Sequence, residues 1–339
     1  MANRGINRIV CRLAVAVVAV VGVAWVYSCK EKPMTAREIY KHDASGVALI
    51  SNHYYYALNL AGTVAYFSGI DTAGNFSGLT DSRAVAAKKP AVRYGAGFLV
   101  SREGNLLTNR HIVRPEIPDS VAFKAVERWR AQKVAKLAAM RDAAKSPEEA
   151  GRYDATLAAL EAADPADAMI SASCQIGAAF AKQKKEGFAQ CRIGQVSGID
   201  DVDLAVVKLM DSKAYKGRYV FHFATGTKGK RTLLETYLRR ARRDYKGRRL
   251  HPGTPLCMIA FADKSPATAR VFEGTVAPGE ASEHLLFSIA APAVADGCPI
   301  LNMYGDVVGV CSNPNFAPHA TGTAVPAKYA KIFLGLDDY

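Results

Sequence analysis

The sequence lacks the residue patterns of the commonest metal and phosphate sites. It has no CxxC pair and no cluster of cysteine and histidine residues, so no structural zinc site is expected. The stretch GTKGKRT at 226–232 does not have the spacing of a Walker phosphate loop. No internal sequence repeat is present. We therefore expect neither a metal nor a cofactor.

Charged residues are also few. They make up 22% of the 339 residues, whereas hydrophobic residues make up 50%. This composition excludes wholesale disorder and is typical of a packed globular protein. The length is sufficient for two modest domains, or for one large β-rich domain with insertions.

The apolar run near the N-terminus is short for a membrane span. LAVAVVAVVGVAWVYS has 16 residues, fewer than the ~20 that a spanning helix needs, and it follows a segment with three arginines, as in a secretory signal. The ending VYSC resembles a bacterial lipobox with Cys29 as the acylated residue. Residues 1–29 are therefore predicted to be a lipoprotein signal, with an uncleaved signal-anchor as the alternative. In both cases the body is exported, anchored to the membrane of the bacterial cell envelope, and faces the periplasm or the exterior.

Cysteines are few, but export would permit disulfides. Apart from Cys11 in the signal and Cys29, five remain, an odd number that leaves at least one thiol unpaired within the chain. These five are Cys174, Cys191, Cys257, Cys298 and Cys311.

The excess of positive charge is local. Of the formal net charge of +13, a net of +11 lies between Lys208 and Leu250, a segment that contains 14 Lys and Arg residues and three acidic residues. A solvated insertion is one interpretation of residues 228–249, and a site for anionic ligands is the other. The candidate anion-binding residues are Arg239, Arg240, Arg242 and Arg243. Nucleic acid is not expected as a partner, because the protein is exported and aromatic residues are too sparse here for base stacking.

Short strand-like segments separated by glycine turns make up most of the chain, a pattern typical of β-barrels. Residues 115–167 differ, because their apolar residues recur at helical spacing. A second helix is predicted to begin at Ser146, with Pro147 in its first position and Glu149 completing a capping box. This helical hairpin would cover or flank a cleft. A closing helix is predicted after Pro326.

Three segments carry the chemistry. LLTNRHIV places His111 at the end of a hairpin strand, DVDLAVVKL places Asp203 before an apolar strand, and DGCPILNMYGDVVGV contains a glycine turn before a hairpin. In this order the segments resemble the trypsin-like serine peptidases, and most of all their HtrA/Deg-like branch, here without a PDZ domain. The resemblance covers about 95–114 and 168–339, and more faintly 45–70.

The resemblance implies a mainly β fold of two six-stranded antiparallel β-barrels of the trypsin-like type, with the helical hairpin inserted and a C-terminal helix. The first barrel would occupy 30–214, with the insertion at 115–167. Residues 215–339 would hold the basic inter-barrel segment, the second barrel and the closing helix. A polypeptide substrate or a peptide-like ligand is the implied partner, besides the membrane and an anionic ligand.

The third segment departs from the family. Alignment on its proline places Asp296 where the nucleophilic serine belongs, and Val294 where a glycine N–H would complete the oxyanion hole. A carboxylate has no hydroxyl for His111 to deprotonate; it would form an ion pair with the imidazolium and raise the histidine pKa. His111, Asp203 and Asp296 are therefore the predicted catalytic positions of a homologue that has lost its nucleophile, and Val294 and Asp296 mark the oxyanion-hole region.

A disulfide is the preferred interpretation of Cys298. In a regular hairpin turning at Tyr304–Gly305, Cys298 and Cys311 would lie directly opposite each other, near the separation that a disulfide needs. Cys174 and Cys191 lie on successive predicted strands and form a second candidate pair. Cys257 would then be a buried core residue.

Three functions fit these observations. The first is an inactive peptidase homologue that acts as a binding or regulatory module at the cell envelope. The second is an active serine endopeptidase with another nucleophile, for which Ser288 is the nearest upstream serine. The third is an envelope adaptor that binds anionic ligands through residues 228–249.

Overall fold

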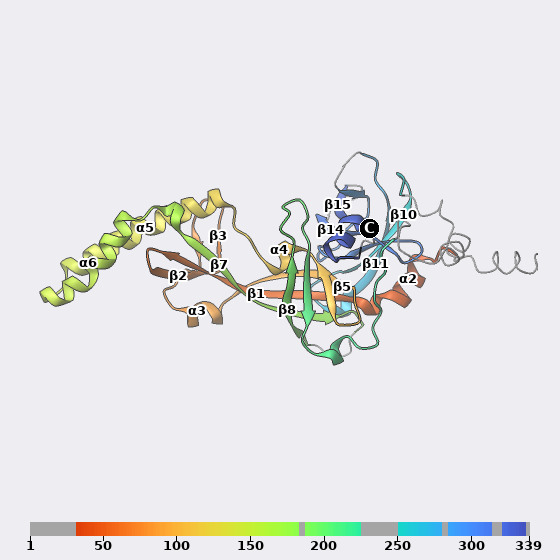
Figure 1. The fold of residues 1–339 in the computed structure, drawn as a ribbon, viewed down its shortest axis with the longest axis horizontal. Coiled ribbons are helices and arrows are strands. Elements are labelled where there is room, and N and C mark those ends of the chain that lie inside the picture. The colour runs from red at the N-terminus through yellow and green to blue at the C-terminus, as the bar shows by residue number, and fades with distance from the viewer. Residues whose placement is uncertain (1–31, 183–186, 225–249, 280–283, 314–320, 337–339) are drawn as a thin grey trace, which may run out of the picture.

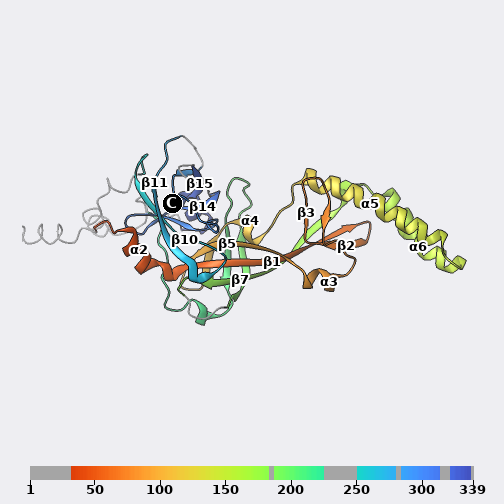
Figure 2. The same ribbon diagram turned by 180° about the vertical axis from the view of Figure 1, so that it is seen from behind.

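The computed structural model describes residues 32–182, 187–224, 250–279, 284–313 and 321–336. The predicted fold class is confirmed, because the described residues are mainly β, with two large antiparallel sheets and a small two-stranded one, an inserted helical hairpin and a C-terminal helix (Figures 1 and 2). The predicted signal at 1–29 and the basic residues 228–249 lie outside the described residues. Among those described, no helix combines the length and apolar character needed to cross a membrane.

The first sheet closes into a six-stranded barrel. Its strands follow the order β1-β5-β6-β9-β8-β7, and pairing of β7 with β1 closes the ring. The six strands are β1 (Val47–Leu60), β5 (Ala91–Leu99), β6 (Asn105–Thr108), β7 (Met169–Phe180), β8 (Ala189–Val196) and β9 (Ala205–Leu209). A core of side chains such as Ile50, Leu106 and Phe180 fills this barrel.

The second sheet is a half-barrel rather than a closed barrel. Its strand order is β11-β10-β13-β14-β15-β12, and its two edges meet only at the bridge between Val276 and Phe287. The strands are β10 (Pro255–Phe261), β11 (Ala269–Thr275), β12 (Leu285–Phe287), β13 (Pro299–Asn302), β14 (Val307–Asn313) and β15 (Gly322–Pro326). The predicted closing helix, α8 (Ala327–Phe333), follows Pro326.

One hydrophobic core joins the two sheets. Phe98 and Leu49 of the first sheet belong to the same buried cluster as Ile259 and Ile300 of the second. Helix α2 (Ala36–Asp43) packs against β11 and buries Ile39 in this cluster. Its N-terminus carries a complete capping box between Thr35 and Glu38. Burial of apolar surface between the sheets therefore fixes their relative position.

Of the two expectations for the helical hairpin, to cover or to flank a cleft, the first is wrong, because the hairpin does not cover a cleft between the sheets. Helices α5 (Asp119–Asp142) and α6 (Pro147–Ala162) lie on an arm that extends away from both sheets (Figure 1). The arm forms because β1 and β7 continue as a pair beyond the barrel, and β2 (Thr63–Phe67) adds to β1. Short elements complete it: β3 (Gly69–Ile70), β4 (Phe76–Ser77) and α3 (Arg83–Lys88).

The hairpin packs on the arm through its predicted apolar stripe. Val126, Trp129 and Leu160 are buried against Leu58 and Phe67 of the arm strands. Met140, near the end of α5, is 42% exposed and lies outside this buried set. Insertion of about fifty residues is therefore stabilised by a local hydrophobic core, separate from that of the sheets.

The start of the second helix is close to the prediction. Ser146 Oγ accepts from the Glu149 amide at 3.2 Å, and Pro147 occupies the first position. The Glu149 carboxylate, however, accepts from the Lys145 amide at 3.0 Å rather than from the amide of Ser146. Both predicted residues therefore cap the helix, but the hydrogen bond to the Glu149 side chain comes from the residue before the N-cap.

The turn before β13 docks the second sheet onto the first. The Ala96 amide of β5 donates to the Asp296 carbonyl at 2.7 Å. Gly297 has φ +82°, and a Cβ at this position would lie 2.0 Å from the Ala96 carbonyl oxygen. Only glycine fits both the backbone conformation and the close approach.

Gly297 and Cys298 form a β-bulge opposite Cys311. The Gly297 amide donates to the Cys311 carbonyl at 2.8 Å, and the Cys311 amide donates to the Cys298 carbonyl at 3.0 Å. Two residues of one strand thus oppose one of the other, with the first a glycine at positive φ, which is the G1 type of bulge. Such a bulge changes the direction of the chain and of its side chains.

The predicted disulfides are wrong: no disulfide joins any of the five cysteines that the structure describes. Cys298 does lie opposite Cys311, but the bulge removes it from the regular cross-strand position, and its Sγ lies 3.9 Å from the Val294 carbonyl. Cys191 lies opposite Ile176, so Cys174 is its diagonal neighbour. Diagonal neighbours are about 7–8 Å apart, which is too far for a disulfide.

Replacement of Gly297 by alanine should weaken the docking of the two sheets. Gly253→Ala is the matched control, because Gly253 has φ +84° but open space where its Cβ would lie. The control should cost about 1–2 kcal/mol of backbone strain, and Gly297→Ala about 1–3 kcal/mol more from the clash with Ala96. Urea unfolding of both variants measures the difference. Equal costs would contradict the docking role of the turn.

Candidate active site

The three predicted catalytic positions meet at the junction of the two sheets. His111 lies in the short helix α4 (Arg110–Val113) after β6, and Asp203 lies just before β9. Asp296 comes from the second sheet, on the turn that docks against β5. All three side chains are partly exposed: 35% for His111, 24% for Asp203 and 33% for Asp296.

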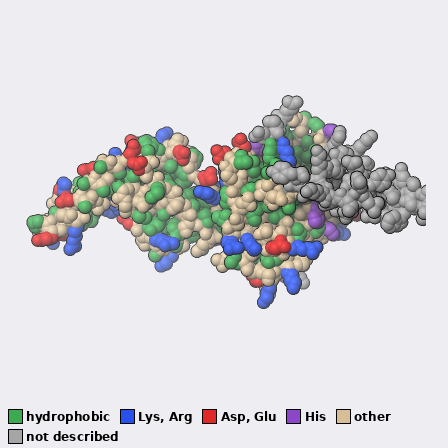
Figure 3. Space-filling model, viewed as in Figure 1, with side chains coloured by type: hydrophobic (Ala, Val, Ile, Leu, Met, Phe, Trp, Pro, Cys, Tyr) green, Lys and Arg blue, Asp and Glu red, His purple; other side chains and the backbone are tan. Residues whose placement is uncertain are grey.

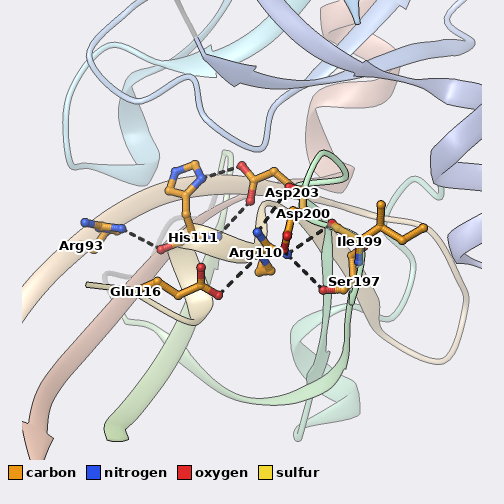
Figure 4. A network of polar contacts seen from close by, with 8 residues as sticks. All are labelled: Arg93, Arg110, His111, Glu116, Ser197, Ile199, Asp200 and Asp203. Carbon is orange, nitrogen blue, oxygen red and sulfur yellow. Dashed lines mark hydrogen bonds and ion pairs between the residues drawn. The ribbon is translucent and has the colours of Figure 1, made fainter. Parts of the chain in front are cut away.

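His111 lies between two carboxylates. Its Nδ1 is 2.7 Å from Asp203 Oδ2, and its backbone amide donates to Asp203 Oδ1 at 3.0 Å (Figure 4). On the other side of the ring, Nε2 is 3.7 Å from Asp296 Oδ2. The other oxygen of Asp296, Oδ1, is buried and has no hydrogen-bond partner among the described residues.

These two carboxylates keep the imidazole protonated. Burial lowers the pKa of His111, but the hydrogen bonds and negative charges of Asp203 and Asp296 outweigh it and raise the pKa to about 9. For Asp203, burial raises the pKa, and the hydrogen bonds and charge of His111 outweigh burial and lower it. At neutral pH the site therefore holds an imidazolium ion with a carboxylate at each ring nitrogen.

A protonated histidine cannot start acyl transfer. The base of a serine peptidase must accept a proton from the attacking hydroxyl. Here both ring nitrogens carry protons, and Asp296 presents a carboxylate where the hydroxyl would lie. The arrangement can hold or exchange a proton, but it contains no nucleophile activated by His111.

The oxyanion-hole region is also occupied within the chain. The Val294 amide donates to the Phe261 carbonyl at 3.3 Å, and the Phe261 amide donates back to the Val294 carbonyl at 3.2 Å. Val294 itself is buried, with 5% of its surface exposed. An amide already bonded within a β-bridge does not present its N–H to a substrate oxygen.

Neither Ser288, the alternative nucleophile, nor the thiol of Cys298 is hydrogen-bonded to His111 among the described residues. Cys298 is fully buried, and burial, followed by the charges of Cys311 and Asp296, raises the pKa of its thiol well above the usual value. The Ser288 hydroxyl lies 3.1 Å from Thr275 Oγ1 and donates to the Thr275 carbonyl at 3.3 Å. Neither residue is placed as a nucleophile beside the imidazole.

Residues that position the His–Asp pair were not indicated by the sequence alone. Arg110 binds the loop before Asp203: it donates to the carbonyls of Ser197, Ile199 and Asp200 at 3.3–3.4 Å. Its guanidinium also lies 3.7 Å from Glu116 (Figure 4). A single arginine thus fixes the segment that carries the carboxylate partner of His111.

Two asparagines complete the support. Asn109 Nδ2 donates to the Asp203 carbonyl at 2.9 Å, and the buried Asn52 Nδ2 donates to the Ile112 carbonyl at 2.9 Å. Arg93 donates to the His111 carbonyl at 2.8 Å. In the sequence, the dipeptide Thr108–Asn109 before His111 indicated part of this support. Asn52 and Arg93 lie on other strands, and nothing in the sequence indicated that they contact the His111 segment.

No group of three or more His, Cys, Asp or Glu side chains within the described ranges is arranged to hold a metal ion. The remaining predicted sites, Cys29 and the arginines at 239, 240, 242 and 243, lie outside these ranges. The structure therefore brings together His111, Asp203 and Asp296, with Val294 near them.

Comparison with known proteins finds likeness to solved structures but no sequence relative. No protein-family model and no curated protein sequence matches the chain. Among solved structures, the chain is similar to the serine endoprotease from Yersinia pestis, with 14% sequence identity, over 90% of this chain and 67% of that chain, at a TM-score of 0.45. A likeness at this level identifies neither a family nor an activity.

The stability of the protein should depend on pH through His111. Because the folded pKa of about 9 lies above the ordinary 6.5, the stabilisation is complete below pH 6.5 and is lost as pH rises through 9. The urea midpoint should therefore fall over this range, and a His111→Gln variant should lose this component. If the urea midpoint of the variant falls with pH as much as that of the wild type, His111 is not the source of the pH dependence.

Proposed function

We propose that this chain is an inactive homologue of the trypsin-like serine peptidases that binds polypeptide and acts as a binding or regulatory module. One observation carries the proposal: the Asp296 carboxylate lies 3.7 Å from His111 Nε2, at the position that the motif assigns to the nucleophile. The His–Asp pair is retained, but the second ring nitrogen faces a carboxylate rather than a hydroxyl.

Two further observations support the loss of hydrolysis. The Val294 amide is bonded to Phe261, so one donor of the oxyanion hole is not available. The hydroxyl of Ser288, the nucleophile of the alternative endopeptidase hypothesis, bonds Thr275 instead of the imidazole. No second function is favoured by a contact among the described residues.

The imidazolium also has a structural use in this proposal. It lies between an aspartate of the first sheet and an aspartate of the second, so the ion pairs join the two sheets at the former catalytic junction. Both pairs are partly exposed, and each contributes modestly to stability. A site that once moved a proton would thus hold the two halves of a binding surface in register.

The location in the cell remains part of the proposal. The arginines near the N-terminus, the short apolar run and the VYSC ending support export and acylation at Cys29. The module would then act at the bacterial cell envelope, facing the periplasm or the exterior. Anionic ligands at Arg239, Arg240, Arg242 and Arg243 would be a secondary contact with the envelope.

Labelling with a fluorophosphonate probe tests the proposed loss of activity. The wild-type protein should stay unlabelled, because no serine is activated. An Asp296→Ser variant should be labelled at residue 296, because a hydroxyl then replaces the carboxylate next to His111 Nε2. Its peptide hydrolysis should remain about 100-fold or more below that of an intact site, because the Val294 donor is missing.

Asp296→Ala is the matched control, since it removes the carboxylate without supplying a hydroxyl, and it should stay unlabelled. Labelling of the wild-type protein, located by mass spectrometry to any serine, would contradict the proposal.

A further inference from the structure

One edge of β7 is open over half its length. On one side, β7 pairs with β1 continuously from Met169 to Phe180. On the other, its ladder with β8 covers only Ile176–Ala178. Over residues 169–175, β7 therefore has no neighbouring strand on this second side among the described residues.

The register shows which backbone groups face the open side. The Ala181 amide, just after β7, donates to the Val47 carbonyl, so the backbone groups of the odd-numbered residues of β7 face β1. The even-numbered Ile176 and Ala178 pair with β8, so their backbone groups face the opposite side. By the same alternation, the amides and carbonyls of Ile170, Ala172 and Cys174 face the open side. They present the hydrogen-bonding pattern to which another strand can be added.

The open edge has none of the usual features that prevent strand addition. The sequence MISASCQ at 169–175 contains no charged residue, no proline and no glycine, and no bulge interrupts its register. Exposed edges are normally protected by such features, because an unprotected edge recruits other strands. Met169 is even 67% exposed.

A cavity of about 840 Å³ lies beside this edge. One wall is β7, and the other is formed by Ile193 and Val196 of β8 together with residues 113–117, which begin at the last residue of α4. The walls carry the apolar side chains of Ile117, Ile170 and Ile193 together with charged Arg114 and Glu116. In the space-filling view, a notch is visible where the arm joins the sheets, with acidic side chains near its rim (Figure 3).

One end of the cavity carries a carboxylate. Asp119, the first residue of α5, lines it together with Ala122 and Ala168, and α5 contacts the short helix η2 (Pro165–Asp167) just before β7. Asp119 forms no ion pair with any described residue, whereas Glu116 lies 3.7 Å from Arg110. The Met169 end of the groove therefore has a negative charge to offer a basic side chain.

We propose that the groove between β7 and the 113–117 segment binds an extended polypeptide of a partner protein by strand addition. The bound segment would pair with Ile170, Ala172 and Cys174, place alternate apolar side chains in the cavity, and direct a lysine or arginine to Asp119. This deepens the proposed function, on whose binding role it rests, by naming where the polypeptide binds.

The walls select a single segment rather than a second copy of this chain. The space beside β7 is bounded by β8 and by residues 113–117, so a strand that already belongs to a folded sheet would meet these walls. A free extended segment needs only the spacing of neighbouring strands, about 4.8 Å. The groove uses neither His111 nor Asp296 and begins at Val113, two residues after the histidine.

The test measures binding of a synthetic peptide of alternating valine and threonine with a lysine at one end, labelled with fluorescein. Fluorescence anisotropy should show saturable binding to the wild-type protein. Ala172→Pro removes the amide that faces the groove but leaves the β1 ladder intact, and should weaken binding about tenfold. Ala172→Val keeps the amide and should bind like the wild type.

Two further controls identify the mode of binding. The same peptide with alternate backbone amides N-methylated should not bind, because it cannot complete the ladder. Asp119→Asn should weaken binding of the lysine peptide about threefold at low salt, and the difference should disappear at high salt. Thermal unfolding of each variant shows that it is folded.

The proposal is overturned if the peptide does not bind the wild type, if Ala172→Pro binds as tightly as Ala172→Val, or if the N-methylated peptide binds equally well. A wild-type dimer that Ala172→Pro converts to a monomer, without peptide binding, would assign the edge to a second copy and also overturn it. Failure of the proposed function gives a different result. If the wild-type protein reacts with the fluorophosphonate but the variants still differ in peptide binding, the loss of hydrolysis is disproved and the groove still binds the peptide.

Discussion

The site depends on the docking of one turn against one strand. The Asp296 carbonyl accepts from the Ala96 amide at 2.7 Å, and Gly297 passes so close to the Ala96 carbonyl that a side chain cannot fit. This contact brings a residue of the second sheet to within 3.7 Å of His111 in the first. The bulge at Gly297 then directs the chain into β13, so backbone geometry positions the turn whatever side chain stands at 296.

Once the turn is docked, electrostatics decides what the site can do. An imidazole with one carboxylate partner can act as a base when the group on its other side is a neutral hydroxyl. With carboxylates on both sides, the proton is held, and the pKa of His111 rises to about 9. With Asp296 beside Asp203, the proton acceptor becomes a cation at neutral pH that links the two sheets. The remaining sheet edge on β7 offers a different chemistry, based on backbone pairing.

The fold class could be predicted from the sequence, and so could the proximity of His111, Asp203 and Asp296. These three residues lie in local motifs that have fixed positions in a double β-sheet fold. It was not sufficient where tertiary contacts decide. The disulfide prediction assumed a regular hairpin, and the bulge at Gly297 could not be read from the residues. The place of the helical hairpin depended on how far β1 and β7 continue beyond the barrel, which local periodicity does not indicate.

His111 is an imidazolium ion at neutral pH because Asp296 faces its second ring nitrogen while Asp203 faces the first. Nitrogen-15 NMR of the histidine ring in the folded protein at pH 7.5 tests this claim most directly, with Asp296→Asn as the comparison. We expect two protonated ring nitrogens in the wild type and a lower histidine pKa in the variant. A neutral His111 ring in the wild type at this pH would contradict it.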